Sequence, residues 1–257
     1  MSSNLVAWRI VAVLFVFVLL SPLALVILFA FTSRSLANFP IEALSLQWWG
    51  EMLAHRQFAS AFWNSLIVGG LVGLISAVVG TAAAMGFSRM PPRRAGIGIA
   101  VLSLPLMMPP LVLAVSLLTA FVSVGMTLSL GTVVLSHLLF TQPFVILVIY
   151  ARMAAFDWRV VDSARDLGAS PFKAFMTVTL PIIQPTVIGA ALFAVALSID
   201  DFVITLFTIG DGNTLPIFVW GMMRTGLKPT VNAIGTLIIV MSIGLTLVAL
   251  WLTRYRS

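Results

Sequence analysis

Two adjacent carboxylates, Asp200 and Asp201, interrupt a long apolar stretch in the last quarter of the chain. An ionised carboxylate within a membrane costs about 3 kcal/mol unless it faces water or a partner. Successive side chains on a helix point about 100° apart, so at least one of the two should face a cavity. There it would attract a cationic amine. The alternative is structural, with one aspartate capping a helix or pairing with Arg or Lys.

Aromatic residues are the second candidate for contact with a cation. Trp49 and Trp63 could form a wall along the substrate path, since an ammonium group is attracted to the face of an indole ring. They could equally anchor the chain at the membrane–water interface, where tryptophan is enriched. His137 lies in an apolar segment and is more typical of a packed, hydrogen-bonded histidine than of a ligand.

The motifs of catalysis and cofactor binding are missing from the sequence. It has no cysteine, two histidines far apart, no phosphate-binding P-loop, and none of the zinc-protease or serine-hydrolase motifs. We therefore expect no enzyme activity, no metal site and no cofactor bound by this chain.

The composition is that of a protein solvated by lipid. Of 257 residues, 61% are hydrophobic and 9% are charged, against about 25% charged in a soluble domain. The net charge of +6 falls in loops and does not follow a helix face, which indicates membrane topology and not nucleic-acid binding. We expect an all-α integral membrane protein with residues 1–257 in a single transmembrane domain.

Six apolar stretches are long enough to cross a bilayer as helices, which takes about 20 residues each. The predicted spans are 9–31, 62–87, 97–121, 131–151, 184–209 and 231–253. The acidic pair then lies inside the fifth span, in its outer half.

Lys and Arg residues are unevenly divided between the two sides of these spans. One side carries ten: Arg9, Arg89, Arg93, Arg94, Arg152, Arg159, Arg165, Lys173, Arg254 and Arg256. The other carries four: Arg34, Arg56, Arg224 and Lys228. Since basic residues collect on the cytoplasmic side, both termini and the loop 152–182 are predicted to be cytoplasmic.

That loop is the only sizeable polar break in the second half of the chain. Residues 160–167 can form a short helix that Gly168 ends in a left-handed conformation. Ser170 can cap a second helix, 171–180, which Pro181 and Pro185 close. The result is an elbow suited to transmit motion from a soluble partner. The alternative is an inert connector.

The residues of the elbow carry a recognisable pattern. Asp162-Ser163-Ala164, three residues, Gly168, nine residues and Val178-x-Leu180-Pro181 together resemble the EAA signature of ABC importer permeases. In that family the signature reads Glu-Ala-Ala, three residues, Gly, nine residues, Ile-x-Leu-Pro. The resemblance implies the type I importer fold, with a coupling helix between spans four and five. It also implies a role in ATPase coupling for five residues: Asp162, Ala164, Gly168, Ala169 and Leu180.

Nearly the whole chain is similar to the second permease subunit of spermidine/putrescine transporters. The segments that carry this similarity are 166–170, 198–203, 214–216 and 229–233. One position departs, because Pro110 stands where members often have an acidic residue. Another cargo, such as an amino acid derivative or an opine, is therefore the alternative, and a stand-alone secondary transporter is a further one.

The resemblance also implies how such a subunit works. We expect a bacterial inner-membrane permease that moves polyamines by alternating access. It would assemble with a second homologous permease and with two ATPase subunits that hold ATP and Mg²⁺. An extracytoplasmic binding protein would deliver the small cationic substrate, membrane lipid would surround the spans, and nucleic acid would play no part.

Overall fold

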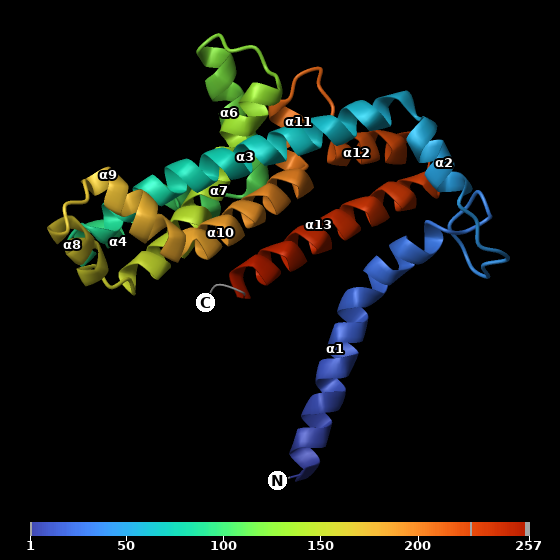
Figure 1. The fold of residues 1–257 in the computed structure, drawn as a ribbon. Helices are drawn as coiled ribbons and strands as arrows, with labels where there is room; N and C mark the ends of the chain where they lie inside the picture. Colours follow the sequence, from blue (N-terminus) through green and yellow to red (C-terminus); the bar gives the residue numbers. More distant parts are fainter. Residues whose placement is uncertain (1, 227, 255–257) are drawn as a thin grey trace. The chain divides into compact units, whose positions relative to one another are not determined.

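The structure is a computed structural model that describes residues 2–226 and 228–254 as helices and loops, with no strand in those ranges (Figure 1). The chain forms two compact units. The first unit comprises Met1–Ala59 and Phe218–Met241, and the second comprises Ser60–Ile217 and Ser242–Ser257.

Five helical segments of the described chain are long and apolar enough to cross a membrane. They belong to α1 (Ser2–Phe29), α3 (Arg56–Ser88), α7 (Leu130–Ala154), α10 (Leu180–Asp200) and α13 (Thr230–Arg254). These correspond to five of the six predicted spans. Shorter helices are α2 (Gln47–Ala54), α8 (Arg159–Asp166) and α12 (Leu215–Thr225).

The third predicted span, 97–121, is not one continuous helix. It is divided into α4 (Pro92–Leu102), α5 (Leu104–Met107) and α6 (Pro110–Ser123). Met108 before the second break is extended, with ψ of 140°. Proline cannot donate a backbone hydrogen bond, and it pushes the residue before it out of the helical region. The Pro109–Pro110 pair therefore starts α6 afresh.

The fifth predicted span, 184–209, is also wrong in its boundaries. α10 ends at Asp200, Asp201 is extended (φ −70°, ψ 124°), and α11 (Val203–Thr208) follows. The acidic pair thus lies at a helix break and not inside an uninterrupted helix.

At its other end the fifth span is longer than expected. Helical structure runs without interruption through α9 (Pro171–Ala174), a π-helical turn (Phe175–Thr179) and α10. Pro181 therefore does not close a helix, because it sits in the first turn of α10 after the wider π turn, where a missing N–H is tolerated. Pro185 lies within α10.

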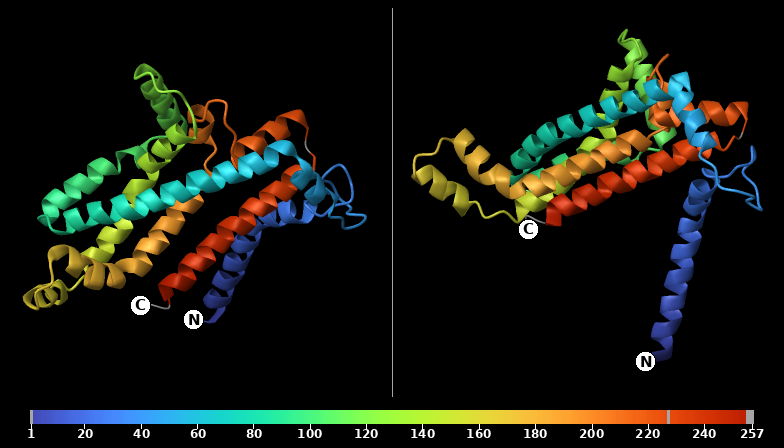
Figure 2. Two further views of the ribbon diagram at one scale, coloured as in Figure 1. Left: turned by 45° about the horizontal axis from the view of Figure 1, so that its top comes forward. Right: turned by 45° about the vertical axis from the view of Figure 1, so that its right-hand side comes forward.

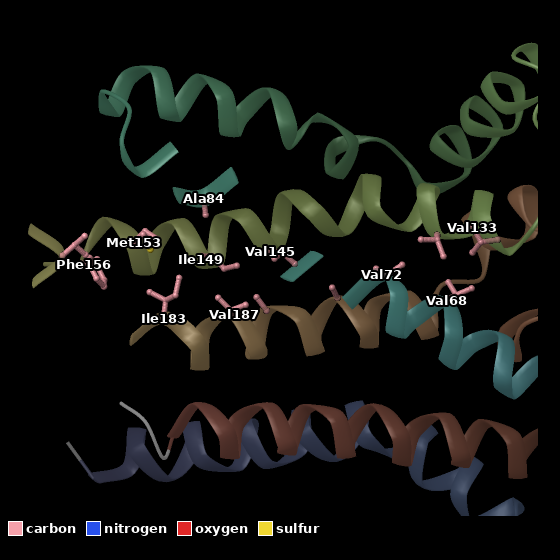
Figure 3. Close-up of a cluster of buried hydrophobic side chains, with 14 of the residues drawn as sticks. Val68, Val72, Ala84, Val133, Val145, Ile149, Met153, Phe156, Ile183 and Val187 are labelled. Carbon is pink, nitrogen blue, oxygen red and sulfur yellow. The ribbon is translucent and has the colours of Figure 1, made fainter. Parts of the chain in front are cut away.

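The core of the second unit lies where α7 and α10 run side by side with α3 (Figures 1 and 2). It is built of aliphatic side chains that fill the space between these helices (Figure 3). The largest fully buried ones are Ile149, Met153, Ile183, Val68, Val72, Val133 and Val145.

Glycines bring α3 close to its two neighbours. A methyl group at Gly80 would lie 2.6 Å from Cγ1 of Val145 on α7. One at Gly73 would overlap the Val195 side chain and lie 3.2 Å from the Ala191 carbonyl oxygen on α10. Close backbone approach at small residues is how helices associate in membranes, where burial of apolar surface adds little.

This contact predicts opposite outcomes for two neighbouring glycines of α3. Gly73→Ala should lower the free energy of unfolding by about 1–3 kcal/mol, because the core has no room for the methyl group. Gly70→Ala should not lower it and should raise it by up to about 1 kcal/mol, since nothing lies within 4 Å of that position and alanine is the better helix former. Thermal unfolding of the purified protein in detergent measures both. Equal unfolding temperatures for the two variants would contradict the close packing.

Candidate functional site

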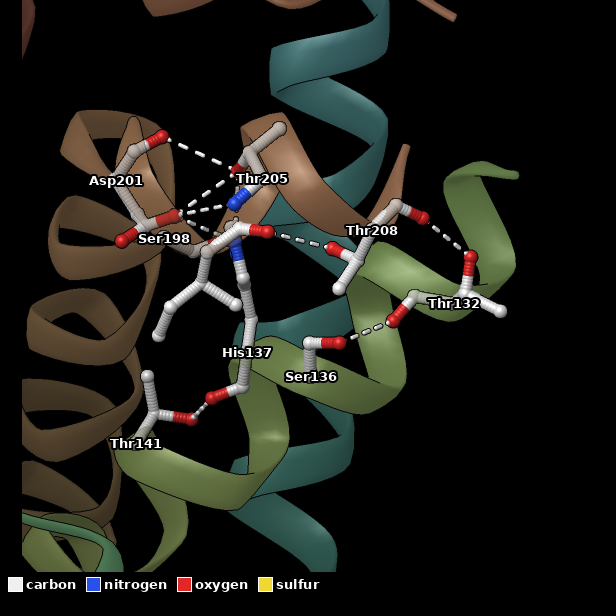
Figure 4. A network of polar contacts seen from close by, with 9 residues as sticks. Thr132, Ser136, His137, Thr141, Ser198, Asp201, Thr205 and Thr208 are labelled. Atoms are coloured by element: carbon white, nitrogen blue, oxygen red, sulfur yellow. Dashed lines mark hydrogen bonds and ion pairs between the residues drawn. The ribbon is translucent and has the colours of Figure 1, made fainter. Parts of the chain in front are cut away.

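The carboxylate of Asp201 is held by hydrogen bonds at the start of α11 (Figure 4). Its Oδ2 accepts from the backbone N–H of Thr205 at 2.9 Å and from the Thr205 hydroxyl at 3.0 Å. The same oxygen is 3.3 Å from Nε2 of His137. Asp201 therefore satisfies the first turn of α11, as a side chain capping a helix N-terminus does.

His137 connects α7 to both sides of the helix break. Its side chain is 1% exposed, its Nδ1 lies 2.7 Å from the Ser198 hydroxyl on α10, and its Nε2 lies 2.9 Å from the Thr205 hydroxyl on α11. This confirms the interpretation of His137 as a packed, hydrogen-bonded residue.

The protons of this network can be assigned by counting donors. The Thr205 hydroxyl has a single proton, and when it donates that proton to Asp201 it must accept one from His137. Nε2 of His137 then carries the hydrogen, and Nδ1 accepts from Ser198. The arrangement favours a chain of hydrogen bonds that runs from Ser198 through His137 and Thr205 to the carboxylate.

A second contact fixes the other end of α11. The Thr132 hydroxyl donates to the Thr208 carbonyl oxygen at 2.6 Å. Thr132 also forms a capping box with Ser129 at the start of α7. α11 is therefore fastened to the first turns of α7 at one end and to His137 at the other.

Asp200 is in a different environment from its neighbour. It is the last residue of α10, its side chain is exposed, and among the described residues it makes no hydrogen bond or ion pair. The sequence left two alternatives for the pair, a structural role or contact with a cargo. Asp201 has the structural role. Asp200 fits the other prediction, in which a carboxylate is open to a ligand.

The tryptophans lie apart from this network. Trp63, 61% exposed, packs edge-on against Phe62 at 5.7 Å, and no contact joins it to the carboxylates in the described part of the second unit. Trp49 belongs to the first unit, where its ring lies 5.5 Å from that of Phe31. Its neighbour Trp48 is buried and donates to the Thr32 carbonyl oxygen at 2.7 Å.

The turn of the elbow (α8, α9 and the residues between them) has the expected local structure. Gly168 has a φ of +89° and follows the end of α8. The N–H of Ala169 donates to the Ala164 carbonyl at 3.1 Å and that of Gly168 donates to the Arg165 carbonyl at 2.9 Å, which is the Schellman pattern. The Ser170 hydroxyl caps α9 by accepting from the Lys173 N–H at 3.3 Å. The predicted roles of Gly168 and Ser170 in the turn are confirmed.

The elbow presents apolar side chains to solvent on a polar surface. Leu167 is 90% exposed and Phe172 is 70% exposed, while Asp162 is also exposed. Ala164 and Ala169 instead pack against the buried core. Exposed apolar residues gathered on a polar loop are typical of a protein–protein contact. Sequence reasoning missed Leu167, which adjoins the signature glycine.

The loop that leads into the elbow contains a local, solvent-exposed ion pair. The Arg159 side chain donates to the Asp157 carboxylate at 3.0 Å. This hydrogen bond, with a second from the Arg159 backbone, holds the pKa of Asp157 below its ordinary value. This charge pair lies at the start of α8, outside the apolar spans.

Comparison with known proteins identifies the architecture. Residues 69–256 match the family described as binding-protein-dependent transport system inner membrane component. The chain belongs to this family. It is a permease, an inner membrane component of a transport system, and not a member of an enzyme family.

Two curated relatives cover most of the permease. It is 36% identical to the putrescine transport system permease protein PotI of Escherichia coli, over 90% of this chain and 85% of that protein. It is 30% identical to the spermidine/putrescine transport system permease protein PotC of Haemophilus influenzae, over 84% of each.

Solved structures show the same fold at low sequence identity. A bacterial ABC transporter that imports the acidic polysaccharide alginate aligns over 98% of the permease and 95% of its own chain, with a TM-score of 0.77 and 14% identity. The MetNI methionine ABC transporter aligns over 77% and 95%, with a TM-score of 0.62 and 16% identity. The permease therefore has the predicted all-α fold of ABC importer permeases.

The two aspartates should respond differently to truncation. Asp201→Ala should lower the permease's free energy of unfolding by about 1–3 kcal/mol, because Thr205 and His137 lose a largely buried acceptor. Asp200→Ala should change it by less than about 0.5 kcal/mol, as expected for an exposed group without partners. Thermal unfolding in one detergent compares them. The assignment fails when Asp200→Ala is the more damaging change.

Proposed function

We propose that this permease carries polyamines and that the exposed carboxylate of Asp200 binds their ammonium groups. The proposal rests on the different environments of the two aspartates at the helix break. Asp201 is engaged with Thr205 and His137, whereas Asp200 is exposed and without a partner in the described chain. The names of the relatives, putrescine and spermidine/putrescine permeases, support the same cargo.

The charge balance around the pair favours a cationic cargo. The sequence contains no Lys or Arg between Lys173 and Arg224, so α10 and α11 supply no cation of their own. A carboxylate in apolar surroundings is stabilised by water or by an opposite charge. An arriving ammonium group would supply that charge at Asp200, and Asp201 would add a second negative charge nearby. Trp63 would offer an aromatic face to the same path, while Trp49 is better suited to packing or anchoring.

The elbow is the proposed contact for an ATPase subunit. Asp162, Leu167 and Phe172 form the exposed surface. Ala164, Gly168 and Ala169 set its shape, and Leu180, half-buried in the first turn of α10, links it to the fifth span. Hydrolysis of Mg²⁺-bound ATP on two such subunits would move the elbow and drive alternating access.

The remaining partners follow from the same family. A second permease would complete the pathway, and an extracytoplasmic binding protein would deliver the cargo. One of the structurally similar ABC transporters, the alginate importer, has been solved in complex with its periplasmic protein. The excess of Lys and Arg on one side of the spans supports cytoplasmic termini.

Loss of the Asp200 charge should weaken cargo binding. In cells that express the whole transporter, Asp200→Asn should raise the KM for labelled putrescine and spermidine about tenfold, because a hydrogen bond to a charged group contributes about 1.5–3 kcal/mol. The matched control is Asp211→Asn, which removes an exposed charge from a nearby loop. Amino acids and opines serve as competitors. Unchanged kinetics in Asp200→Asn would contradict the role of Asp200, and competition by an amino acid alone would contradict the cargo.

Strain in the elbow turn should weaken the stimulation of ATP hydrolysis by the cargo. Gly168→Val forces a β-branched residue into the left-handed region, at a cost of about 1–2 kcal/mol, although nothing lies within 4 Å of the added carbon. Cargo-stimulated ATP hydrolysis of the purified transporter should fall, because the elbow changes shape. Gly168→Asn should retain most of it, since asparagine tolerates this conformation. Full stimulation in Gly168→Val would refute the coupling role.

A further inference from the structure

The first residue beyond α3, Arg89, makes a contact that the family motif does not explain. Its Cζ lies 3.9 Å from the centroid of the Trp158 ring, in the geometry of a cation–π interaction. Trp158 directly precedes α8, so this contact joins the end of α3 to the residue at which the elbow begins to turn into α8.

Trp158 is a fixed platform for this contact. Its ring packs edge-on against Phe156 at 5.0 Å, and Phe156 belongs to the buried core with Met153. Within α8 itself only Val161 is buried, and its charged residues point to solvent. α8 is therefore fixed to the rest of the second unit by the packing of Val161 and Ala164 and by the Trp158 ring at its start, where Arg89 adds a charged contact.

The opposite end of α3 is fastened as well. Nδ2 of Asn64 donates to the Asn213 carbonyl oxygen at 2.8 Å, and the N–H of Leu215 donates to the buried Ser65 hydroxyl at 2.9 Å. These contacts hold the loop 209–214, which directly follows α11 and its Asp201 network. Between the two ends, α3 lies against α7 and α10 at its glycines.

We propose that Arg89 and Trp158 form a clasp that makes α3 move with the elbow. The clasp would carry a displacement of the elbow along α3 to the loop 209–214, beside the carboxylates at the helix break. A helix of 33 residues spans about 50 Å and acts as a stiff rod. The inference rests on the proposed function, because it concerns how the motion started by the ATPase reaches the cargo site. Arg89 is thus a positioning residue.

The transport test compares Arg89→Ala with a matched charge removal. Arg94→Ala deletes an exposed arginine from the first turn of α4, five residues further on, and leaves the clasp intact. In proteoliposomes that contain the whole transporter, Arg89→Ala should lower putrescine uptake per ATP hydrolysed by roughly fivefold or more. Arg94→Ala should not, and Arg89→Lys should restore most of the ratio because it keeps the cation.

A double substitution tests whether the two residues act as one unit. Trp158→Ala should match Arg89→Ala, and combining them should cause little further loss, since contacting residues are not additive. The proposal is overturned when Arg89→Ala and Arg94→Ala have the same uptake per ATP, or when the two losses multiply in the double variant.

The distance between two spin labels, one on α3 and one on α8, tests the clasp independently of transport. Because the chain has no cysteine, Gly86→Cys on α3 and Ser163→Cys on α8 can carry the only spin labels, and Gly86 has open space for one. In the purified transporter, Arg89→Ala should broaden the distance distribution between them, and Arg94→Ala should not. Equal widths overturn the clasp. A different result would refute the polyamine cargo instead. In that result the wild-type transporter hydrolyses ATP and shows a narrow distance distribution, but it takes up no amine.

Discussion

The structure around the acidic pair depends on how the carboxylate of Asp201 is satisfied. Its acceptance of two hydrogen bonds from Thr205 allows the helix to stop at Asp200 and restart at Val203 without leaving the Asp201 carboxylate unpaired. His137 then fixes this break to α7. With Asp201 engaged, the exposed Asp200 is left as the charge available to a ligand. One polar network thereby determines both the path of the chain and the chemistry that it presents.

Sequence reasoning succeeded where the determinants are local. Gly168 and Ser170 define the elbow turn through their own backbone preferences and capping ability, so their neighbours in sequence were sufficient. It failed at Asp201, because the hydropathy of residues 202–207 continues the span while the break depends on His137, more than sixty positions away. The spacing of Asp201 and Thr205, four residues apart, was a signal of a new helix start. The break before α6 was also visible in principle, since Pro109 and Pro110 stand there.

The second unit combines an apolar middle with polar ends. Aliphatic side chains and glycines pack α3, α7 and α10 together along their length. Side-chain hydrogen bonds and the Arg89–Trp158 contact lie at the ends of these helices. Such a division suits a permease, because a dense middle transmits displacement while the polar contacts fix the ends of the helices to the elbow and to the loop 209–214. The proposed cargo site and the elbow lie at opposite ends of the same helix, α10, which connects them through the chain.

The π turn at Phe175–Thr179 has a consequence for how this helix tolerates changes in length. Its hydrogen bonds close over five residues and not four, so the turn stores about one surplus residue. Removing one residue there would let the backbone relax to ordinary α geometry without rotating α10 against the elbow. The junction can therefore absorb the deletion of a single residue while Phe172 on one side and Ile183 on the other keep their facing.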